Sequence, residues 1–184
     1  MDENDRHFTE GPDDLLLEHL GLFKQKTLRG PVLDLACGNG HNGVFLGTMG
    51  LEVVLADVSE NALAEAGGLA HRNGVPARIW QVDLEQEGFN PLASETYGAI
   101  LVFRYLHRPL IPCIRKALVA GGLLLYETFT VDQARFGKPK NPDHLLKPGE
   151  LLDRFKGWRV LHYFEGTKDH PKKAIAQIVC IKPD

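Results

Sequence analysis

Three aspartates stand within, at the end of or just after apolar runs of this chain. A glycine-rich run follows the first of these aspartates in the sequence. Asp34 lies within Val32–Leu35, Asp57 ends a second apolar run, and Asp83 follows a third. Carboxylates accept hydrogen bonds from amines and hydroxyl groups, whereas they repel a phosphate. These acids therefore predict a site for a ligand that is rich in amino and hydroxyl donors.

The run from Gly38 to Gly43 reads Gly-Asn-Gly-His-Asn-Gly and precedes a helical pattern. Glycines at such a place let a ligand lie against bare backbone at a helix N-terminus. The run also satisfies the dinucleotide pattern GxGxxG, which is a weak signal by itself. NAD and a phosphate-free nucleoside cofactor therefore both remain open at this motif.

Short apolar runs alternate with helical patterns, which predicts an α/β fold with a doubly wound, mostly parallel sheet. The expected strands are Pro31–Leu35, Glu52–Asp57, Ala77–Val82, Ala99–Phe103 and Leu123–Thr128, followed by an antiparallel hairpin of Trp158–Glu165 and Lys173–Ile181. The expected helices are Asp13–Lys26, His41–Met49, Ser59–Asn73, Leu110–Leu118 and Gly149–Phe155. The hairpin brings the sheet to seven strands.

The three acids should line one crevice, because parallel strands end at the same edge of an open sheet. Asp57 can accept both hydroxyls of a ribose, which fits either cofactor. Asp83 can accept a hydrogen bond from the exocyclic amine of an adenine. Asp34 suits an ammonium group better than a pyrophosphate. The ligand then carries an amine, a ribose and an adenine, and no phosphate.

The residues from Asp34 to Gly40 resemble the first motif of the class I S-adenosylmethionine-dependent methyltransferases, and the resemblance covers about Pro31–Phe129. Ala36 stands where that family usually has its first glycine. The resemblance implies S-adenosylmethionine as cofactor, with Asp57 as the ribose-binding acid and Asp83 as the adenine-contacting acid. It implies a cofactor site of Asp34, Ala36, Gly38, Gly40, Asp57, Val58, Asp83, Leu84 and Phe103. The small size and the run Arg104–Arg108 are similar to the tellurite-resistance-type group.

The methyl acceptor should lie where the fourth and fifth strands end. His107 is the expected base, because histidine exchanges protons readily near neutral pH. Glu127 would orient the acceptor, and Arg104 and Tyr126 complete the expected catalytic set. A segment like Asn-Pro-Pro-Tyr does not follow the fourth strand, which argues against methylation of a flipped nucleic-acid base.

Charge divides unevenly along the 184 residues, whose net charge is −3. Residues 1–100 carry 6 Lys and Arg against 16 Asp and Glu, and residues 101–184 carry 15 against 8. The basic second part favours an anionic small-molecule acceptor, and the absence of a dense basic run does not favour nucleic acid. No apolar run approaches the ~20 residues that span a bilayer.

Three cysteines without CxxC spacing and eight histidines without a close pair predict neither disulfides nor a metal site. We therefore expect a cytoplasmic protein, and the sequence does not set its oligomeric state. One domain is expected, with an N-terminal helical segment (1–30), a cofactor-binding core (31–129), a lid loop (130–148), and a short helix and hairpin (149–184). The leading hypothesis is methyl transfer to a small molecule. A protein or RNA acceptor, an NAD-dependent oxidoreductase and a non-catalytic cofactor-binding domain remain as alternatives.

Overall fold

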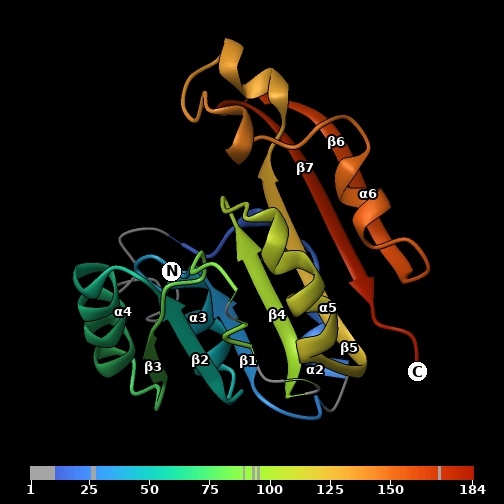
Figure 1. Cartoon of the computed structure of the whole chain (residues 1–184). Coiled ribbons are helices and arrows are strands. Elements are labelled where there is room, and N and C mark those ends of the chain that lie inside the picture. Colours follow the sequence, from blue (N-terminus) through green and yellow to red (C-terminus); the bar gives the residue numbers. More distant parts are fainter. Residues whose placement is uncertain (1–10, 26–27, 89, 93, 95, 170) are drawn as a thin grey trace.

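A seven-stranded sheet is the frame of the molecule (Figure 1). The computed structural model describes residues 11–25, 28–88, 90–92, 94, 96–169 and 171–184, so the first ten residues and Lys26 lie outside the described residues. The strands are β1 (Val32–Leu35), β2 (Val53–Asp57), β3 (Arg78–Gln81), β4 (Tyr97–Phe103), β5 (Leu118–Phe129), β6 (Arg159–Asp169) and β7 (Lys172–Ile181).

The strand order is β3-β2-β1-β4-β5-β7-β6, and only β7 runs against its neighbours β5 and β6. This confirms the predicted doubly wound sheet with a terminal antiparallel hairpin. The chain winds outward from β1 in one direction and from β4 in the other. The crevice beyond the carboxyl ends of β1 and β4 is therefore the place where such a sheet binds its ligand.

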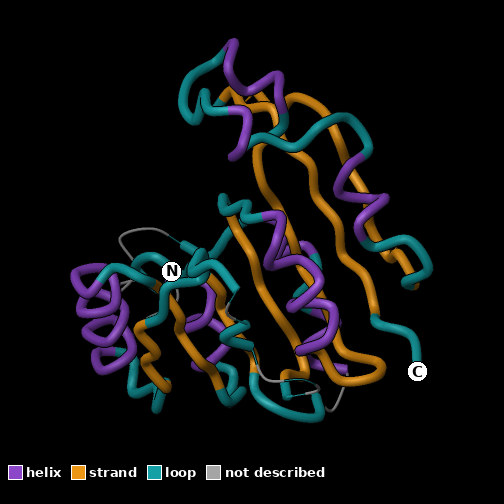
Figure 2. Tube along the Cα trace, in the orientation of Figure 1, coloured by secondary structure: helices purple, strands orange, loops and turns teal. Residues whose placement is uncertain are grey.

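Helices cover both faces of the sheet (Figure 2). They are α1 (Asp14–Glu18), α2 (Gly21–Gln25), α3 (His41–Thr48), α4 (Glu60–Arg72), α5 (Ile111–Ala117) and α6 (Glu150–Arg154), with short 3-10 helices η2 (Arg108–Leu110), η3 (Val131–Arg135) and η4 (Pro142–His144). Residues of α1 to α4 share one buried cluster with the sheet, and residues of α5 and α6 share the other. The expected helix Asp13–Lys26 is two short helices that are separated at His19 and Leu20.

The fifth strand begins five residues before the expected Leu123. Its pairing with β4 shifts register where Leu118 faces Tyr97 and Leu123 already faces Ala99. Gly121 has a φ of +69°, a conformation that glycine adopts without strain. Gly121 and Gly122 predict a break in the chain just before the fifth strand, but both lie inside β5, where the pairing is irregular.

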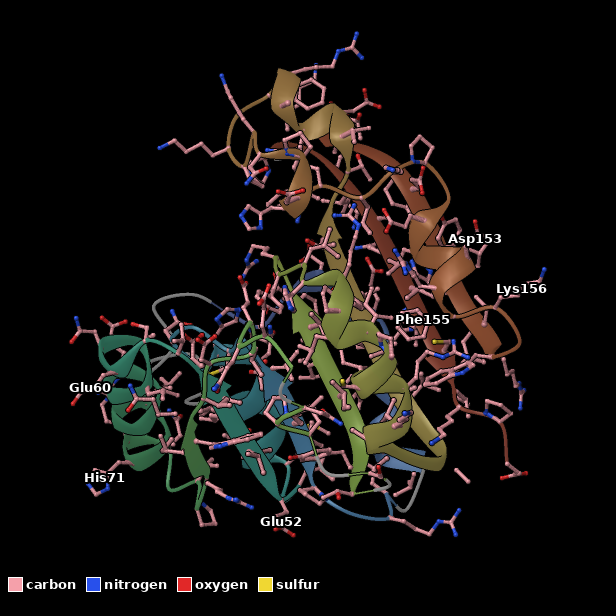
Figure 3. All side chains as sticks on the ribbon, in the orientation of Figure 1. Glu52, Glu60, His71, Asp153, Phe155 and Lys156 are labelled. Atoms are coloured by element: carbon pink, nitrogen blue, oxygen red, sulfur yellow. The ribbon has the colours of Figure 1, made fainter. Side chains whose placement is uncertain are left out.

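Local sequence explains α4 well. The Ser59 side chain accepts a hydrogen bond from the Ala62 amide at 3.2 Å and caps the helix. Glu60 lies in the first turn and His71 in the last, at opposite ends of the helix in Figure 3, as the helix dipole favours. Leu63 and Leu69 are among the residues that α4 buries against the sheet.

Aromatic packing fixes α6 on the other face. Phe155 is fully buried, with its ring 6.3 Å from that of Tyr126 and 5.2 Å from that of Trp158, both edge-on. Asp153 and Lys156 project away from the sheet in Figure 3. This anchor holds the C-terminal end of α6, where Phe155 is the C-cap residue.

Residues 130–148, the expected lid, are closed at their base. The Val131 amide donates to the Leu146 carbonyl at 3.0 Å, and the Leu146 amide donates to the Phe129 carbonyl at 2.9 Å. The buried Gln133 side chain accepts from the Ala174 amide at 2.9 Å and donates to the Lys138 carbonyl at 3.1 Å. The segment therefore folds back on β5 and β7 as η3, a turn and η4.

Candidate functional site

Three left-handed residues shape the turn between β1 and α3. Ala36 and Gly38 each have a φ of +54°, and Gly40 has a φ of +76°. A Cβ at Gly40 would lie 2.8 Å from the Cβ of Ala66 in α4, so this glycine allows the helix to pack. A Cβ at Gly38 would meet nothing within 4 Å, so the space above Gly38 is open to a ligand.

Asp34 is buried under this turn, with 3% of its surface exposed. Its carboxylate accepts a hydrogen bond from the Gly43 amide at 2.8 Å. Burial raises the pKa of Asp34 to about 7, although that hydrogen bond opposes the shift. A Cβ at Gly43 would lie 3.0 Å from the Asp34 side chain and 2.4 Å from Leu55, which explains the glycine there.

The two other acids stand at the ends of β2 and β3. Asp57 accepts from the Gly38 amide and from the Ser59 amide, both at 2.9 Å, one to each carboxylate oxygen. Each oxygen keeps a second lone pair, so Asp57 can still accept hydroxyl donors while its direction is fixed. Asp83 accepts from the Glu85 amide at 2.9 Å and is exposed.

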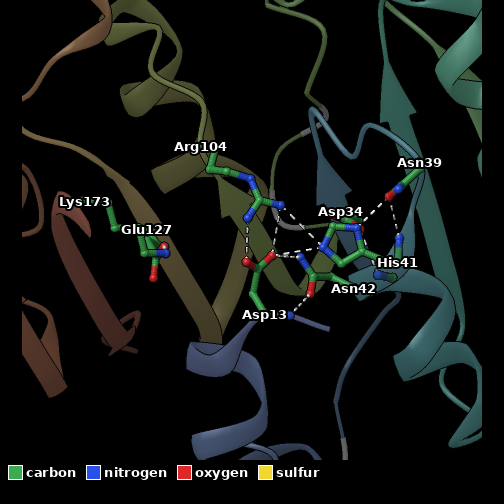
Figure 4. A network of polar contacts seen from close by, with 9 residues as sticks. Asp13, Asp34, Asn39, His41, Asn42, Arg104, Glu127 and Lys173 are labelled. Atoms are coloured by element: carbon green, nitrogen blue, oxygen red, sulfur yellow. Dashed lines mark hydrogen bonds and ion pairs between the residues drawn. The ribbon is translucent and has the colours of Figure 1, made fainter. Parts of the chain in front are cut away.

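A polar network borders the crevice, with Asp13 at its centre (Figure 4). Asp13 accepts from Arg104 Nη1 at 2.6 Å and from Asn42 Nδ2 at 2.8 Å, and lies 3.1 Å from His41 Nε2. Asn39 Oδ1 lies 2.6 Å from the other ring nitrogen of His41. Burial opposes ionisation, but the hydrogen bonds and the Arg104 charge outweigh it and lower the pKa of Asp13.

The cleft below this network has a volume of about 400 Å³. It is lined by Asp34, Ala36, Cys37, Gly38, Asn39, His41, Asn42, Phe103, Arg104 and Tyr105. Five predicted cofactor or catalytic residues are thus brought together: Asp34, Ala36, Gly38, Phe103 and Arg104. Four others lie beyond this cleft at the ends of β2 and β3: Asp57, Val58, Asp83 and Leu84. Gly40 packs behind the cleft rather than lining it.

Sequence reasoning missed Asp13, His41 and Asn42 as residues of the site. The signal available for the last two was their place directly after Gly40, at the start of a helix. No local signal marks Asp13, which reaches them across 28 and 29 residues of chain.

A second hollow, of about 590 Å³, adjoins the cleft and shares Arg104 and Tyr105 with it. Its lining residues are Glu85, Arg104, Tyr105, Leu106, Phe129, Lys138, Pro139, Lys140, Asn141 and His144. Arg104 has a φ of +56°, an unusual backbone for a non-glycine residue at the end of a strand. The Tyr105 hydroxyl is buried and lies near Glu85. Burial, together with the Glu85 carboxylate, raises the pKa of Tyr105. We call this hollow the acceptor pocket, after the methyl acceptor that the sequence analysis expects at the ends of the fourth and fifth strands.

The other predicted catalytic residues lie around this pocket rather than in its wall. His107 borders a neighbouring hollow that also touches Glu85, Leu106, Asn141 and His144. Tyr126 is buried, and its hydroxyl donates to the Tyr105 carbonyl at 3.1 Å. Glu127 is 2% exposed, pairs with Lys173 Nζ at 2.8 Å and accepts from the Gln177 amide group.

Known proteins resemble this chain in sequence. Residues 32–122 match the family model described as a methyltransferase domain. "Hemagglutinin 1" of Eikenella corrodens is 31% identical over 142 residues, which are 73% of this chain and 46% of that protein. "Probable S-adenosyl-L-methionine-dependent methyltransferase TehB" of Haemophilus influenzae is 27% identical over 143 residues, 73% of this chain and 48% of that protein. The chain spans about half the length of these curated relatives.

Solved structures show the same fold. TehB of Haemophilus influenzae superposes with a TM-score of 0.73 at 19% identity, covering 97% of this chain and 65% of that one. The PH0226 protein of Pyrococcus horikoshii OT3 superposes with a TM-score of 0.69 at 19% identity and covers both chains completely.

The strand order, with its antiparallel terminal hairpin, is that of a class I methyltransferase fold. Residues 32–122 belong to the class I S-adenosylmethionine-dependent methyltransferases, a family whose cofactor is S-adenosyl-L-methionine. Among the described residues, none of the helices combines the length and the apolar character that crossing a bilayer requires.

Proposed function

We propose that this chain transfers the sulfonium methyl group of S-adenosylmethionine to a small anionic molecule. The observation that carries the proposal is the pair of adjoining hollows that share Arg104 and Tyr105. The cleft offers backbone, Asp34 and an open glycine, and Asp57 lies beyond it; together these suit the amine and ribose of the cofactor. The acceptor pocket offers Lys138 and Lys140 beside Arg104, which suit an anion.

Bound in the cleft, S-adenosylmethionine supplies a methyl carbon that its positive sulfur has already activated. The acceptor atom forms a bond to that carbon while the carbon–sulfur bond breaks and its electron pair stays on sulfur. S-adenosylhomocysteine is the second product. The chain then has two tasks, which are to align the acceptor in line with that bond and to take a proton where the acceptor carries one.

The residues divide these tasks. Asp57 and Asp83 would hold the ribose and the adenine, and Asp34 would face the ammonium group. Arg104 and the two lysines would hold the anionic group of the acceptor. We propose His107 as the base, because its hollow shares residues with the acceptor pocket.

The backbone carbonyl of Glu127 and the hydroxyl of Tyr126 would act through neighbours. The Arg104 amide donates to the Glu127 carbonyl at 2.8 Å, and the Tyr126 hydroxyl holds the Tyr105 carbonyl. Both therefore fix the loop that carries Arg104 and Tyr105. Residues 130–148 would cover the bound acceptor and exclude water. The cytoplasmic location stays a prediction from the three cysteines, which are free in the structure.

A screen for S-adenosylhomocysteine formation tests this function. Small carboxylates are compared with their methyl esters and amides, at equal concentrations. We expect product with acids and little with the neutral partners. Product with a protein or an RNA alone, or with neutral acceptors alone, would contradict the anionic small-molecule assignment. Cofactor binding without product from any acceptor class would favour a non-catalytic domain.

Lysine variants sharpen the screen. With an acidic acceptor, Lys138→Met combined with Lys140→Met should raise KM several-fold and leave kcat near that of the parent. Two partly exposed charge contacts of about 0.2–1 kcal/mol each account for that size. Lys156→Met is the matched control, because Lys156 lies on the far side of α6 (Figure 3). An unchanged KM in the double variant would remove these lysines from the acceptor site.

A further inference from the structure

Arg108 joins three parts of the chain that meet at the acceptor pocket. It stands at the start of η2, directly after the loop that carries Arg104 and Tyr105. Its Nη1 donates to the Asp143 carbonyl at 2.8 Å, and its Nη2 donates to the Leu145 carbonyl at 2.8 Å. The guanidinium thus holds the last part of the segment 130–148.

The Glu150 carboxylate fixes the direction of Arg108. Nε and Nη2 of Arg108 donate to its two oxygens at 2.8 and 2.9 Å, a two-point pairing. Glu150 also accepts from the Lys147 amide at 3.0 Å and from Arg154 Nη2 at 2.9 Å. The hydrogen bond from Arg108 is the main cause that lowers the pKa of Glu150 to about 2.

The segment is therefore held at both ends by side chains. Gln133 binds its first part to β7, and Arg108 binds its last part to η2 and α6. Within this segment, the residues that line the acceptor pocket are Lys138–Asn141 and His144. Lys138–Asn141 lie between Gln133 and the carbonyls that Arg108 binds, and His144 lies between those two carbonyls. The place of the two lysines thus depends on two side chains, Gln133 and Arg108, that do not themselves line the pocket.

We propose that Arg108 is a positioning residue that presets the acceptor-side wall of the pocket. The identity of the ligand in the pocket rests on the proposed function, whereas the attachment made by Arg108 does not depend on it. Arg108 acts through the backbone of residues 141–146 and leaves the cofactor cleft alone. Motion of the cover is then confined to the turn near Gly137–Asn141, and acceptors meet a wall that is already in place.

An arginine is required by this geometry. Its planar fork donates in several fixed directions at once, and here four donations go to one carboxylate and two carbonyls. A lysine keeps the charge but presents a single ammonium group, so it can restore part of the pairing with Glu150 and not the whole set. The two variants Arg108→Met and Arg108→Lys separate charge from geometry.

Hydrogen exchange of the full chain tests the attachment without any acceptor. In Arg108→Met, the amides of His144 to Leu146 should exchange about tenfold faster or more, because a charge-assisted attachment is lost. Arg108→Lys should be intermediate. Arg154→Met is the matched control, since Arg154 binds the same carboxylate but, within the described residues, donates to none of the 141–146 carbonyls. Parent-like exchange in Arg108→Met would overturn the proposal.

Ligand binding gives the second readout, with benzoate as an anionic probe in ligand-observed NMR and S-adenosylhomocysteine in calorimetry. Arg108→Met should weaken benzoate binding about tenfold and spare S-adenosylhomocysteine, with Arg108→Lys between. Equal loss of both ligands would mean general unfolding and would contradict a positioning role. If benzoate fails to bind the parent, the anion preference of the proposed function falls, and the exchange result still decides the role of Arg108.

Discussion

The two hollows that meet at Arg104 are built in different ways. Most residues that line the cofactor cleft come from the ten consecutive positions Asp34–Gly43. Some polar contacts of this run stay within the turn, and others reach Asp57 across 19 residues and Asp13 across 28 and 29 residues. The acceptor pocket is held by contacts that span 35 to 42 residues, from Arg108 to Asp143, Leu145 and Glu150. The cleft is therefore built mainly from one local turn, whereas the shape of the pocket depends on tertiary contacts.

Charge follows the same division. Asp34 in the cleft and Asp57 beyond it come from the acidic first part of the chain, and Lys138 and Lys140 come from the basic second part. Arg104 stands at the boundary, where it pairs with Asp13 at 2.6 Å and keeps 43% of its side chain exposed. A cationic, hydroxyl-rich ligand and an anionic one can therefore lie side by side with complementary surroundings.

The largest expected effect belongs to the base. If His107 takes a proton from the acceptor, His107→Ala should lower kcat about 10²–10⁴-fold and keep cofactor affinity within about threefold. Steady-state kinetics with an acceptor from the screen measure the first, and calorimetry measures the second. Unchanged turnover would remove His107 from the catalytic set and favour an acceptor that is already ionised.

The next effect tests the cleft alone. Asp57→Ala removes the acceptor of two ribose hydrogen bonds and also frees the Gly38 and Ser59 amides. Hydrogen bonds to a charged group contribute about 1.5–3 kcal/mol each, so the Kd for S-adenosylhomocysteine should rise tenfold or more. Asp57→Asn keeps the shape and serves as the control for folding. Parent-like affinity in Asp57→Ala would show that the ribose site lies elsewhere.

Cofactor binding should release a proton near neutral pH. Burial raises the pKa of Asp34 to about 7, so below that pH the free protein holds the acid protonated. A bound ammonium favours the carboxylate, and affinity should therefore rise with pH toward about 7.5, by at most about tenfold per pH unit. Calorimetry in two buffers with different ionisation enthalpies measures the proton. If the affinity for the cofactor does not change with pH, either in the parent or in Asp34→Asn, then Asp34 does not contact the ammonium group of the cofactor.

The smallest effect concerns the backbone under the cleft. Ala36 holds a φ of +54°, where a Cβ is strained and glycine is not. Ala36→Gly should raise the free energy of unfolding by about 0.5–1 kcal/mol, and Ala36→Val should lower it. Urea denaturation measures both. A destabilised Ala36→Gly would mean that contacts of the methyl group outweigh the backbone strain.

The sequence predicted the sheet and the cleft because both follow from local patterns. Apolar runs mark β1 to β5, and the glycine run with its flanking acids marks the turn. It did not reveal Asp13, because that carboxylate reaches His41 and Asn42 only after the chain has folded. It predicted an irregular stretch at 130–148 and missed the buried Gln133 and the Arg108–Glu150 pair that hold it. These depend on distant partners, which periodicity and turn signals do not encode.

The central claim is that the crevice between β1 and β4 holds a nucleoside that bears an amine and no phosphate. A calorimetric titration of the unmodified chain with S-adenosylhomocysteine, and in parallel with NADH, tests this claim most directly. We predict saturable binding of S-adenosylhomocysteine at one site per chain and no binding of NADH. Binding of NADH in place of S-adenosylhomocysteine would contradict the account.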